Sequence, residues 1–274
     1  MKNFEKQVVL ITGASSGLGA LAAQRFAQEG ANIVLVARRE ERLKELASRL
    51  QEDYQVQAHV IAADLSQEAA IERVVEKTLT RFGRIDFLLS GAGYGDFKAA
   101  TEFGYEEVEA MFRLNTLAMI HLINLVAKQM QVQGNGRILI IASIAGKVAT
   151  PYSSVYSSTK FAMIGYANAL RLELAPQGIG VTTINPGPIQ TEFFSGNARL
   201  TAYFKNVQKW ALSPEAVVEA IMKAAARKRA PREVNMPWVL AVSDVLYHLF
   251  PRLADRLTAS LADQKKVEVE DDSD

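Results

Sequence analysis

A tyrosine and a lysine four positions apart, Tyr156 and Lys160, have the spacing best suited to chemistry in this chain of 274 residues. On a helix, two such side chains share a face and lie about 6 Å apart along the axis. A tyrosine phenol has a pKa of about 10, and a neighbouring ammonium favours the phenolate and lowers that pKa. The pair therefore predicts a general acid and base, in which Tyr156 exchanges a proton with a substrate.

Ser143 lies thirteen positions before Tyr156, just after an expected strand over 137–141. Ligands of open α/β sheets bind at the carboxyl ends of the strands. We therefore expect the Ser143 hydroxyl to hydrogen-bond a carbonyl oxygen of the substrate while Tyr156 delivers the proton. The Tyr-x3-Lys spacing is common by chance, so the position of Ser143 gives this assignment its weight.

A glycine-rich turn follows the first apolar run of the chain, residues 8–11. It reads Thr12-Gly13-Ala14-Ser15-Ser16-Gly17-Leu18-Gly19 and precedes a helical pattern that ends near Glu29. Such a turn presents backbone amides and a helix N-terminus to a phosphate. Its G-x3-G-x-G spacing differs from the more common G-x-G-x-x-G fingerprint. The turn predicts a nucleotide site.

The T-G-x3-G-x-G turn, taken with Ser143, Tyr156 and Lys160, resembles the short-chain dehydrogenase/reductase family in its compact, single-domain branch. The resemblance covers roughly residues 7–191. It implies hydride transfer between a nicotinamide cofactor and a carbonyl or secondary alcohol, with Tyr156 as the general acid and base. It also implies a homodimer or homotetramer built through the helices around 105–131 and 155–175.

Asn115 matches the family's fourth catalytic position, where the resemblance implies that it holds a water connecting Lys160 to solvent. The expected catalytic residues are therefore Asn115, Ser143, Tyr156 and Lys160. Two other functions stay open on the same scaffold. One is an epimerase or dehydratase that retains its cofactor, which needs a larger substrate region than the about 80 residues after Thr191 supply. The other is a non-catalytic cofactor sensor, against which the intact catalytic set argues.

The end of the second expected strand indicates which cofactor binds. Relatives that prefer NAD carry an acid there, which binds the ribose 2′-hydroxyl, whereas an arginine favours a 2′-phosphate. Here the position holds Ala37, followed by Arg38. We therefore predict NADP(H) in preference to NAD(H), with Arg38 and Ser15 at the 2′-phosphate. The alternative is that Arg38 and Arg39 only begin the solvent-exposed face of the helix from Glu40.

The resemblance implies further cofactor contacts after the later strands. Asp64 would contact the adenine, although a residue of this type could equally serve a turn or cap a helix. Ser90-Gly91-Ala92-Gly93 stands where the family has Asn-Asn-Ala-Gly, so two amides that brace the turn are missing. The full set of expected cofactor-binding residues is Gly13, Ser15, Ser16, Gly17, Leu18, Gly19, Arg38, Asp64, Leu65, Ala92, Gly93, Asn115, Tyr156, Lys160, Pro186, Gly187, Ile189 and Thr191.

Composition argues against several other classes of protein. The chain has no cysteine and three histidines, which excludes thiol chemistry and argues against a metal site. Its 31 basic and 30 acidic residues nearly balance, so no net field attracts nucleic acid. No apolar run reaches the about 18 residues of a transmembrane helix, and the N-terminus lacks a signal-peptide core. We therefore expect a cytoplasmic protein.

Short apolar runs alternate with amphipathic helical patterns as far as about residue 186. Strands are expected at 8–11, 33–36, 56–61, 85–89, 137–141 and 180–184. Nearly continuous apolar strands separated by helices predict a doubly wound, Rossmann-like α/β fold, with a parallel sheet covered on both faces. We expect one domain over residues 1–262 and a disordered acidic tail over 263–274.

The region after Thr191 is rich in large apolar side chains. They are Phe193, Phe194, Tyr203, Phe204 and Trp210, and Tyr94 and Phe97 follow the fourth expected strand. They predict an apolar or aromatic carbonyl substrate, unless they only pack against the C-terminal helices. Residues 238–250 read as a packed helix, with a membrane-surface segment or a cap over an apolar pocket as alternatives.

Overall fold

The computed structural model describes residues 4–194, 201, 204, 205 and 207–259, and at 240–243 and 257–259 the backbone alone. Its centre is a seven-stranded sheet in the order β3-β2-β1-β4-β5-β6-β7, in which all neighbours pair in parallel. The strands are β1 (Val8–Thr12), β2 (Asn32–Ala37), β3 (Ala58–Ala62), β4 (Phe87–Ser90), β5 (Gly136–Ile141), β6 (Ile179–Pro186) and β7 (Glu233–Met236). The predicted Rossmann-like fold is confirmed.

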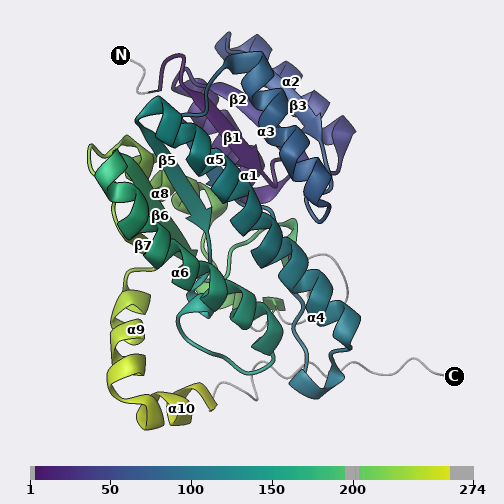
Figure 1. Cartoon of the computed structure of the whole chain (residues 1–274). Helices are drawn as coiled ribbons and strands as arrows, with labels where there is room; N and C mark the ends of the chain where they lie inside the picture. The colour runs from purple at the N-terminus through teal and green to yellow at the C-terminus, as the bar shows by residue number, and fades with distance from the viewer. Residues whose placement is uncertain (1–3, 195–200, 202–203, 206, 260–274) are drawn as a thin grey trace, which may run out of the picture.

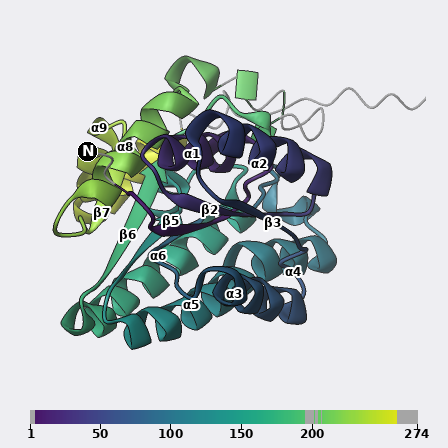
Figure 2. The same ribbon diagram turned by 90° about the horizontal axis from the view of Figure 1, so that it is seen from above.

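Helices cover both faces of the sheet, which Figure 2 shows nearly edge-on between its two helical layers. One layer holds α1 (Gly17–Gln28), α2 (Glu40–Tyr54) and α8 (Pro214–Ala226), and the other holds α3 (Glu68–Phe82), α5 (Met119–Gln133) and α6 (Ser154–Leu174) (Figure 1). Successive strand residues face opposite layers, so Leu10 packs under α5 while Val9 and Ile11 pack under α1. Burial on both faces explains why these strands are apolar throughout.

The helical stretch expected over 105–131 is interrupted. It consists of α4 (Tyr105–Phe112), a π-helical turn over Arg113–Ala118 and then α5. By length and hydropathy, Tyr105–Gln133 could cross a membrane, but half of its most apolar window is buried within the protein. Packing of α5 against α3 and the sheet accounts for that apolar character.

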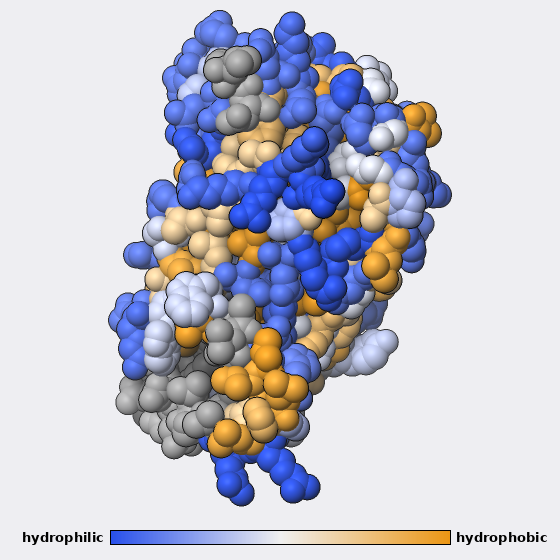
Figure 3. Space-filling model, turned by 90° about the vertical axis from the view of Figure 1, so that its left-hand side faces the viewer, coloured by the Kyte–Doolittle hydropathy of each residue, from blue (hydrophilic) through white to orange (hydrophobic). Residues whose placement is uncertain are grey.

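The C-terminal region departs most from the sequence-based expectation. Strand β7 was not predicted, because its four residues are half-buried and lack a continuous apolar run. The expected helix over 238–250 exists as α9 (Val239–Leu249), followed by α10 (Pro251–Ala259). It is not the packed helix that we expected, since Trp238 is 77% and Leu249 65% exposed. Figure 3 views the molecule from the side on which α9 lies in Figure 1, and it shows apolar side chains gathered at the lower end. The boundary at 262 and the acidic tail lie outside the described residues.

Candidate active site

The four residues expected to be catalytic come together at the carboxyl edge of the sheet. Ser143 follows β5 and caps the short helix η3 (Ile144–Gly146), where its hydroxyl accepts the Ala145 N–H at 3.1 Å. Tyr156 and Lys160 lie one turn apart near the start of α6, and Asn115 lies in the π-helical turn. A strand end and two helices thus converge on one point.

Tyr156 is the centre of this group. Its phenol is hydrogen-bonded to the Ser143 hydroxyl. The ammonium of Lys160 lies 5.6 Å from the centroid of the Tyr156 ring and donates to the carbonyl of Ile141 at 3.2 Å. Tyr156 and Lys160 are both buried. The arrangement can therefore place a proton donor, a second hydroxyl and a cation around one small volume.

The amide of Asn115 holds the loop after β4 in place. Its Nδ2 donates to the carbonyl of Tyr94 at 2.7 Å and to Oγ1 of Thr159 at 3.2 Å, and its Oδ1 accepts the Tyr94 N–H at 3.0 Å. The irregular turn explains this polar residue inside a helix, because π-helical turns occur mostly at functional sites and redirect side chains. Asn115 thereby ties the loop to the helix that carries Tyr156.

The pKa of Tyr156 moves opposite to the direction that we predicted. Burial raises it to about 12, although the hydrogen bond from Ser143 lowers it. Burial also lowers the pKa of Lys160 to about 8. The ammonium bonds to the Ile141 carbonyl, and aromatic rings shield the phenol from water. In this arrangement desolvation therefore outweighs the neighbouring cation.

Tyr156 packs against an aromatic cluster, which we define as Phe97, Phe193, Phe194 and Phe204 and of which Phe97 and Phe193 contact its ring. Ring centroids of Phe97 and Phe193 lie 5.4 and 5.9 Å from that of Tyr156. Gly95 permits this approach, since a Cβ there would lie 2.9 Å from Phe193 and 3.0 Å from Tyr156. Of the other aromatic residues singled out, Tyr94 and Trp210 are exposed, and Tyr203 lies outside the described residues.

The glycine turn has the shape that a dinucleotide requires. Gly13 has φ +72°, and a Cβ there would meet the Gly91 carbonyl oxygen at 2.9 Å. A Cβ on Gly19 would lie 2.4 Å from the Gly13 oxygen, so side chains at both positions would break the turn. Helix α1 begins at Gly17, which has φ +52° and faces Thr191. The residues present therefore fit a pyrophosphate at a helix N-terminus.

A single hydroxyl braces the turn that lacks the family's two asparagines. Thr12 Oγ1 accepts the N–H of Gly91 at 3.0 Å and of Ala92 at 3.1 Å. Gly93, next along this turn, lies so close to Asn115 that a Cβ would be 2.9 Å from its Oδ1. Thr12 is fully buried at the end of β1. The turn is therefore held by the first strand, a brace that sequence comparison with the family motif misses.

Arg39 lies at the position where we expected Arg38. Its Nε and Nη2 donate to Ser15 Oγ at 3.1 and 3.0 Å, and Nη2 donates to Ser16 Oγ at 2.6 Å. Arg38 is exposed, and its charge is one of the causes that hold the pKa of Asp64 below its usual range. The sequence led us to assign the 2′-phosphate to Arg38, whereas the side chain that contacts the glycine turn is that of Arg39.

The remaining cofactor candidates lie along the same edge. Asp64 Oδ1 accepts the Ser66 N–H at 3.0 Å, the turn role that we left open, and Leu65 is buried. Pro186 ends β6, Gly187 donates its N–H to the Met236 carbonyl at 2.7 Å, and Ile189 pairs with Leu212. Leu18 packs against the core from α1. These segments follow the strands at the same edge of the sheet, in the spatial order of the strands.

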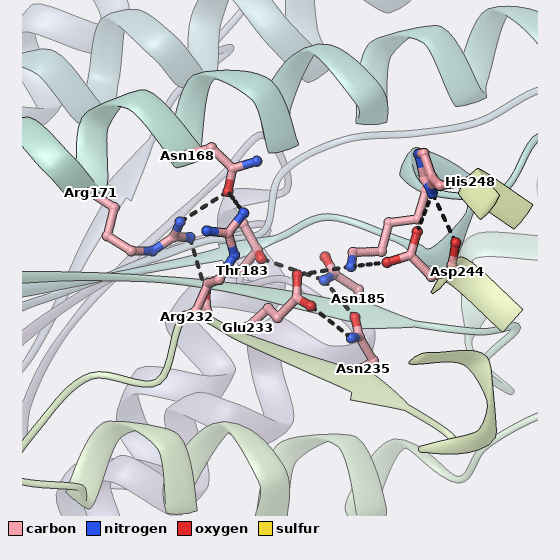
Figure 4. A network of polar contacts seen from close by, with 10 residues as sticks. Asn168, Arg171, Thr183, Asn185, Arg232, Glu233, Asn235, Asp244 and His248 are labelled. Carbon is pink, nitrogen blue, oxygen red and sulfur yellow. Dashed lines mark hydrogen bonds and ion pairs between the residues drawn. The ribbon is translucent and has the colours of Figure 1, made fainter. Parts of the chain in front are cut away.

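A buried charge network that we did not predict adjoins the site. Lys147, just after η3, bonds to Asp244 of α9 at 2.6 Å and to Glu233 of β7 at 2.8 Å. Figure 4 shows that network together with Asn235, which donates to Glu233 at 3.1 Å. The carboxylates hold the pKa of Lys147 above its usual range despite burial. The network ties the C-terminal helices to the loop that begins at Ser143.

Comparisons with known proteins agree with this geometry. The model of the short chain dehydrogenase family matches residues 7–199. An uncharacterized oxidoreductase of Staphylococcus saprophyticus is 36% identical over 236 residues, which are 86% of this chain and 97% of that protein. One of Bacillus subtilis is 33% identical over 261 residues, 94% of this chain and 72% of that protein.

Several solved structures are also similar to this chain. L-Sorbose reductase from Gluconobacter frateurii, complexed with NADPH and L-sorbose, has a TM-score of 0.78 and 29% identity, covering 86% of this chain and 97% of that one. A short-chain dehydrogenase from Sphingobium yanoikuyae in complex with NADPH has a TM-score of 0.75 and 28% identity, covering 97% and 99%. A protein from Burkholderia phymatum in complex with NAD, 22% identical with a TM-score of 0.83 and covering 92% and 96%, shares the fold.

Proposed function

Because the chain belongs to the short chain dehydrogenase family, we propose that it is an NADP(H)-dependent oxidoreductase acting on a carbonyl or secondary alcohol. The observation that carries this proposal is the assembly of Ser143, Lys160 and Asn115 around the buried Tyr156. The nicotinamide would supply or accept the hydride. The chain's own residues handle the proton and the orientation of the substrate.

Tyr156 gives its proton to the carbonyl oxygen in reduction and takes one from the alcohol in oxidation. Ser143, which bonds to the phenol, orients the same oxygen. Lys160 stabilises the phenolate and can return a proton to it, since burial lowers the pKa of this lysine to about 8. Asn115 would hold the water that links Lys160 to solvent.

Cofactor binding is assigned to the segments along the carboxyl edge of the sheet. The amides of the 12–19 turn would hold the pyrophosphate, and Asp64 would contact the adenine. Arg38 and Arg39 are both candidates for the 2′-phosphate, and the contacts of Arg39 with Ser15 and Ser16 favour a direct role for it. The segment from Pro186 to Thr191 would hold the nicotinamide end.

The catalytic assignment is tested by Tyr156→Phe. We expect this variant to keep NADPH binding and to lose about 10²- to 10⁴-fold in turnover, because the phenol's proton is gone. Turnover is measured as absorbance at 340 nm with a panel of ketones and aldehydes. Tyr166→Phe is the matched control on the same helix, where the hydroxyl donates to Asn124. Turnover retained in Tyr156→Phe would overturn the assignment.

Cofactor preference is tested by comparing KM for NADPH and NADH. We expect NADPH to be preferred, and Arg38→Ala and Arg39→Ala each to weaken NADPH with little effect on NADH, because only NADPH carries the 2′-phosphate. The exposed Arg73, on the opposite layer, supplies a control substitution to Ala. A preference of the wild type for NADH would contradict the proposal.

The aromatic cluster supports an apolar or aromatic substrate, since its rings line the approach to Tyr156. A homodimer or homotetramer is proposed through α4, the π-helical turn, α5 and α6, where Leu117, Val132 and Leu172 are 62%, 84% and 77% exposed. Light scattering on the purified protein tests this assembly: Leu172→Arg should shift the mass toward the monomer. A monomeric wild type would contradict it. A cytoplasmic location stays a prediction.

A further inference from the structure

Glu192 forms ion pairs with two arginines of the second βα unit. It begins η5 (Glu192–Phe194), directly after Thr191. Its carboxylate oxygens lie 2.7 and 3.1 Å from Arg42 Nη1, and one of them lies 3.2 Å from Arg39 Nη1. These guanidinium groups hold the pKa of Glu192 below its usual range. A carboxylate from the substrate side of the molecule thus reaches the start of α2.

The same arginines lie where the ribose of a dinucleotide is bound. Arg39 also donates to Ser15 and Ser16 of the glycine turn. In doubly wound folds, the residues that follow the second strand meet the ribose 2′ position. A phosphate monoester carries nearly two charges and, like a carboxylate, prefers the paired N–H groups of arginine. Glu192 therefore has the chemistry of the group that would bind there.

The residues that follow Glu192 belong to the aromatic cluster. The Phe193 ring lies 5.9 Å from the ring of Tyr156 and 5.0 Å from that of Phe194. Because Glu192 and Phe193 are adjacent in one short helical turn, any movement of the backbone at Glu192 also moves the ring that covers Tyr156. The carboxylate that binds the arginines and the ring that covers Tyr156 therefore belong to consecutive residues.

We propose that Glu192 competes with the 2′-phosphate of NADP(H) for Arg39 and Arg42, and that its displacement withdraws Phe193 from Tyr156. The inference rests on the proposed function and makes Glu192 a specificity-determining residue. NAD(H) carries a hydroxyl at the 2′ position and leaves the ion pairs intact. The position of Phe193 on the substrate side of the site therefore depends on which cofactor is bound.

The strength of these ion pairs suits such an exchange. The carboxylate of Glu192 and both guanidinium groups are about half exposed. Each exposed ion pair contributes little and changes an equilibrium constant by about fivefold or less. A dianion with bidentate contacts exceeds that contribution, so Glu192 reduces NADP(H) affinity without preventing binding. Withdrawal of Phe193 also admits water to the phenol, which removes the burial that raises the pKa of Tyr156.

The first test measures dissociation constants of NADPH, NADH and adenosine 2′,5′-bisphosphate for the wild type and Glu192→Gln. We expect the variant to bind NADPH and the bisphosphate about three- to tenfold more tightly, with NADH unchanged. Glu41→Gln is the matched control, because Glu41 lies on α2 but pairs with Lys44. Equal bisphosphate affinity in wild type and Glu192→Gln would overturn the proposal. Weaker NADH binding in the variant would also overturn it, since Glu192 would then bind the ribose hydroxyls.

The second test follows amide hydrogen exchange of residues 192–194. The bisphosphate should accelerate exchange there in the wild type, whereas adenosine 5′-monophosphate should not, and Glu192→Gln should exchange fast without ligand. Unchanged exchange with bound bisphosphate would contradict the link to Phe193. A wild type that binds no NADPH would refute the proposed function instead, so the two failures are distinguishable.

Discussion

The Tyr156 phenol has two kinds of neighbour: Ser143 and Lys160, which we call its polar side, and the rings of Phe97 and Phe193, which we call its aromatic side. The polar side is fixed by directional bonds to backbone atoms, such as those from Lys160 to Ile141 and from Asn115 to Tyr94. The aromatic side is held by ring contacts between loop segments. The polar side therefore determines where the proton can go, while the aromatic side determines how easily Tyr156 releases it.

Removal of the cation is the largest perturbation of the polar side. Lys160→Met should lower turnover about 10²- to 10⁴-fold, because nothing then stabilises the phenolate or returns its proton. The measurement is kcat with NADPH and the best carbonyl of the panel. Lys223→Met removes a lysine that is 73% exposed and should leave kcat unchanged. Equal turnover of wild type and Lys160→Met would show that the aromatic side alone governs the phenol.

Lys160→Met should also have a larger free energy of unfolding than the wild type at pH 7. Burial lowers the pKa of Lys160 from 10.5 to about 8, so the unfolded chain binds more protons between these values. The group's contribution to stability is therefore complete above pH 10.5 and is lost as pH falls to 8. Lys160→Met should gain up to about 3 kcal/mol in the free energy of unfolding at pH 7. Denaturant titrations at several pH values check that this gain shrinks as pH rises.

The next largest effect is expected from loss of the Asn115 amide, which should lower the free energy of unfolding. Asn115→Ala leaves the N–H and carbonyl of Tyr94 without these partners, which should lower the free energy of unfolding by about 2–3 kcal/mol. The matched control is Asn124→Ala on α5, whose exposed side chain accepts from Tyr166 and should cost less than about 1 kcal/mol. Similar losses for both variants would mean that the loop does not depend on Asn115.

The smallest effect is expected on the aromatic side. Phe193→Ala should hydrate the phenol, so the pKa of Tyr156 falls from about 12 and the acidic limb of the alcohol-oxidation profile, where the phenol becomes protonated, moves to lower pH. A shift of about one pH unit is expected. Phe204→Ala is the control, because that ring stacks on Phe194 at 4.9 Å. An identical profile in Phe193→Ala and wild type would show that other groups set the proton affinity.

The same contrast explains what could be predicted from the sequence. Helical spacing places Tyr156 beside Lys160 and strand periodicity places Ser143 at the sheet edge, so the polar side follows from local rules. The parallel sheet follows in the same way from alternating apolar runs. The role of Asn115 in bracing the loop does not, because it depends on a π-helical turn that a helical pattern conceals.

Contacts between distant segments explain the remaining differences. The ion pairs of Glu192 with Arg39 and Arg42 join residues about 150 positions apart, and no spacing rule connects them. The rise in the pKa of Tyr156 arises from rings on two loops, whereas the sequence showed only the nearby cation. Strand β7 is a short edge strand whose side chains are only half-buried, so its pattern carries no signal.

The Lys147 network has a consequence for how the molecule comes apart. Asp244 connects α9 to a buried ammonium, while Val245, Leu246 and Leu249 of the same helix are at least half exposed. An element held through charge responds to acid differently from one held through apolar burial. As pH falls through the lowered pKa of Glu233, Lys147 loses one of its two carboxylate partners. Because apolar burial in the sheet does not depend on charge, acid should weaken the attachment of the C-terminal helices before it unfolds the sheet.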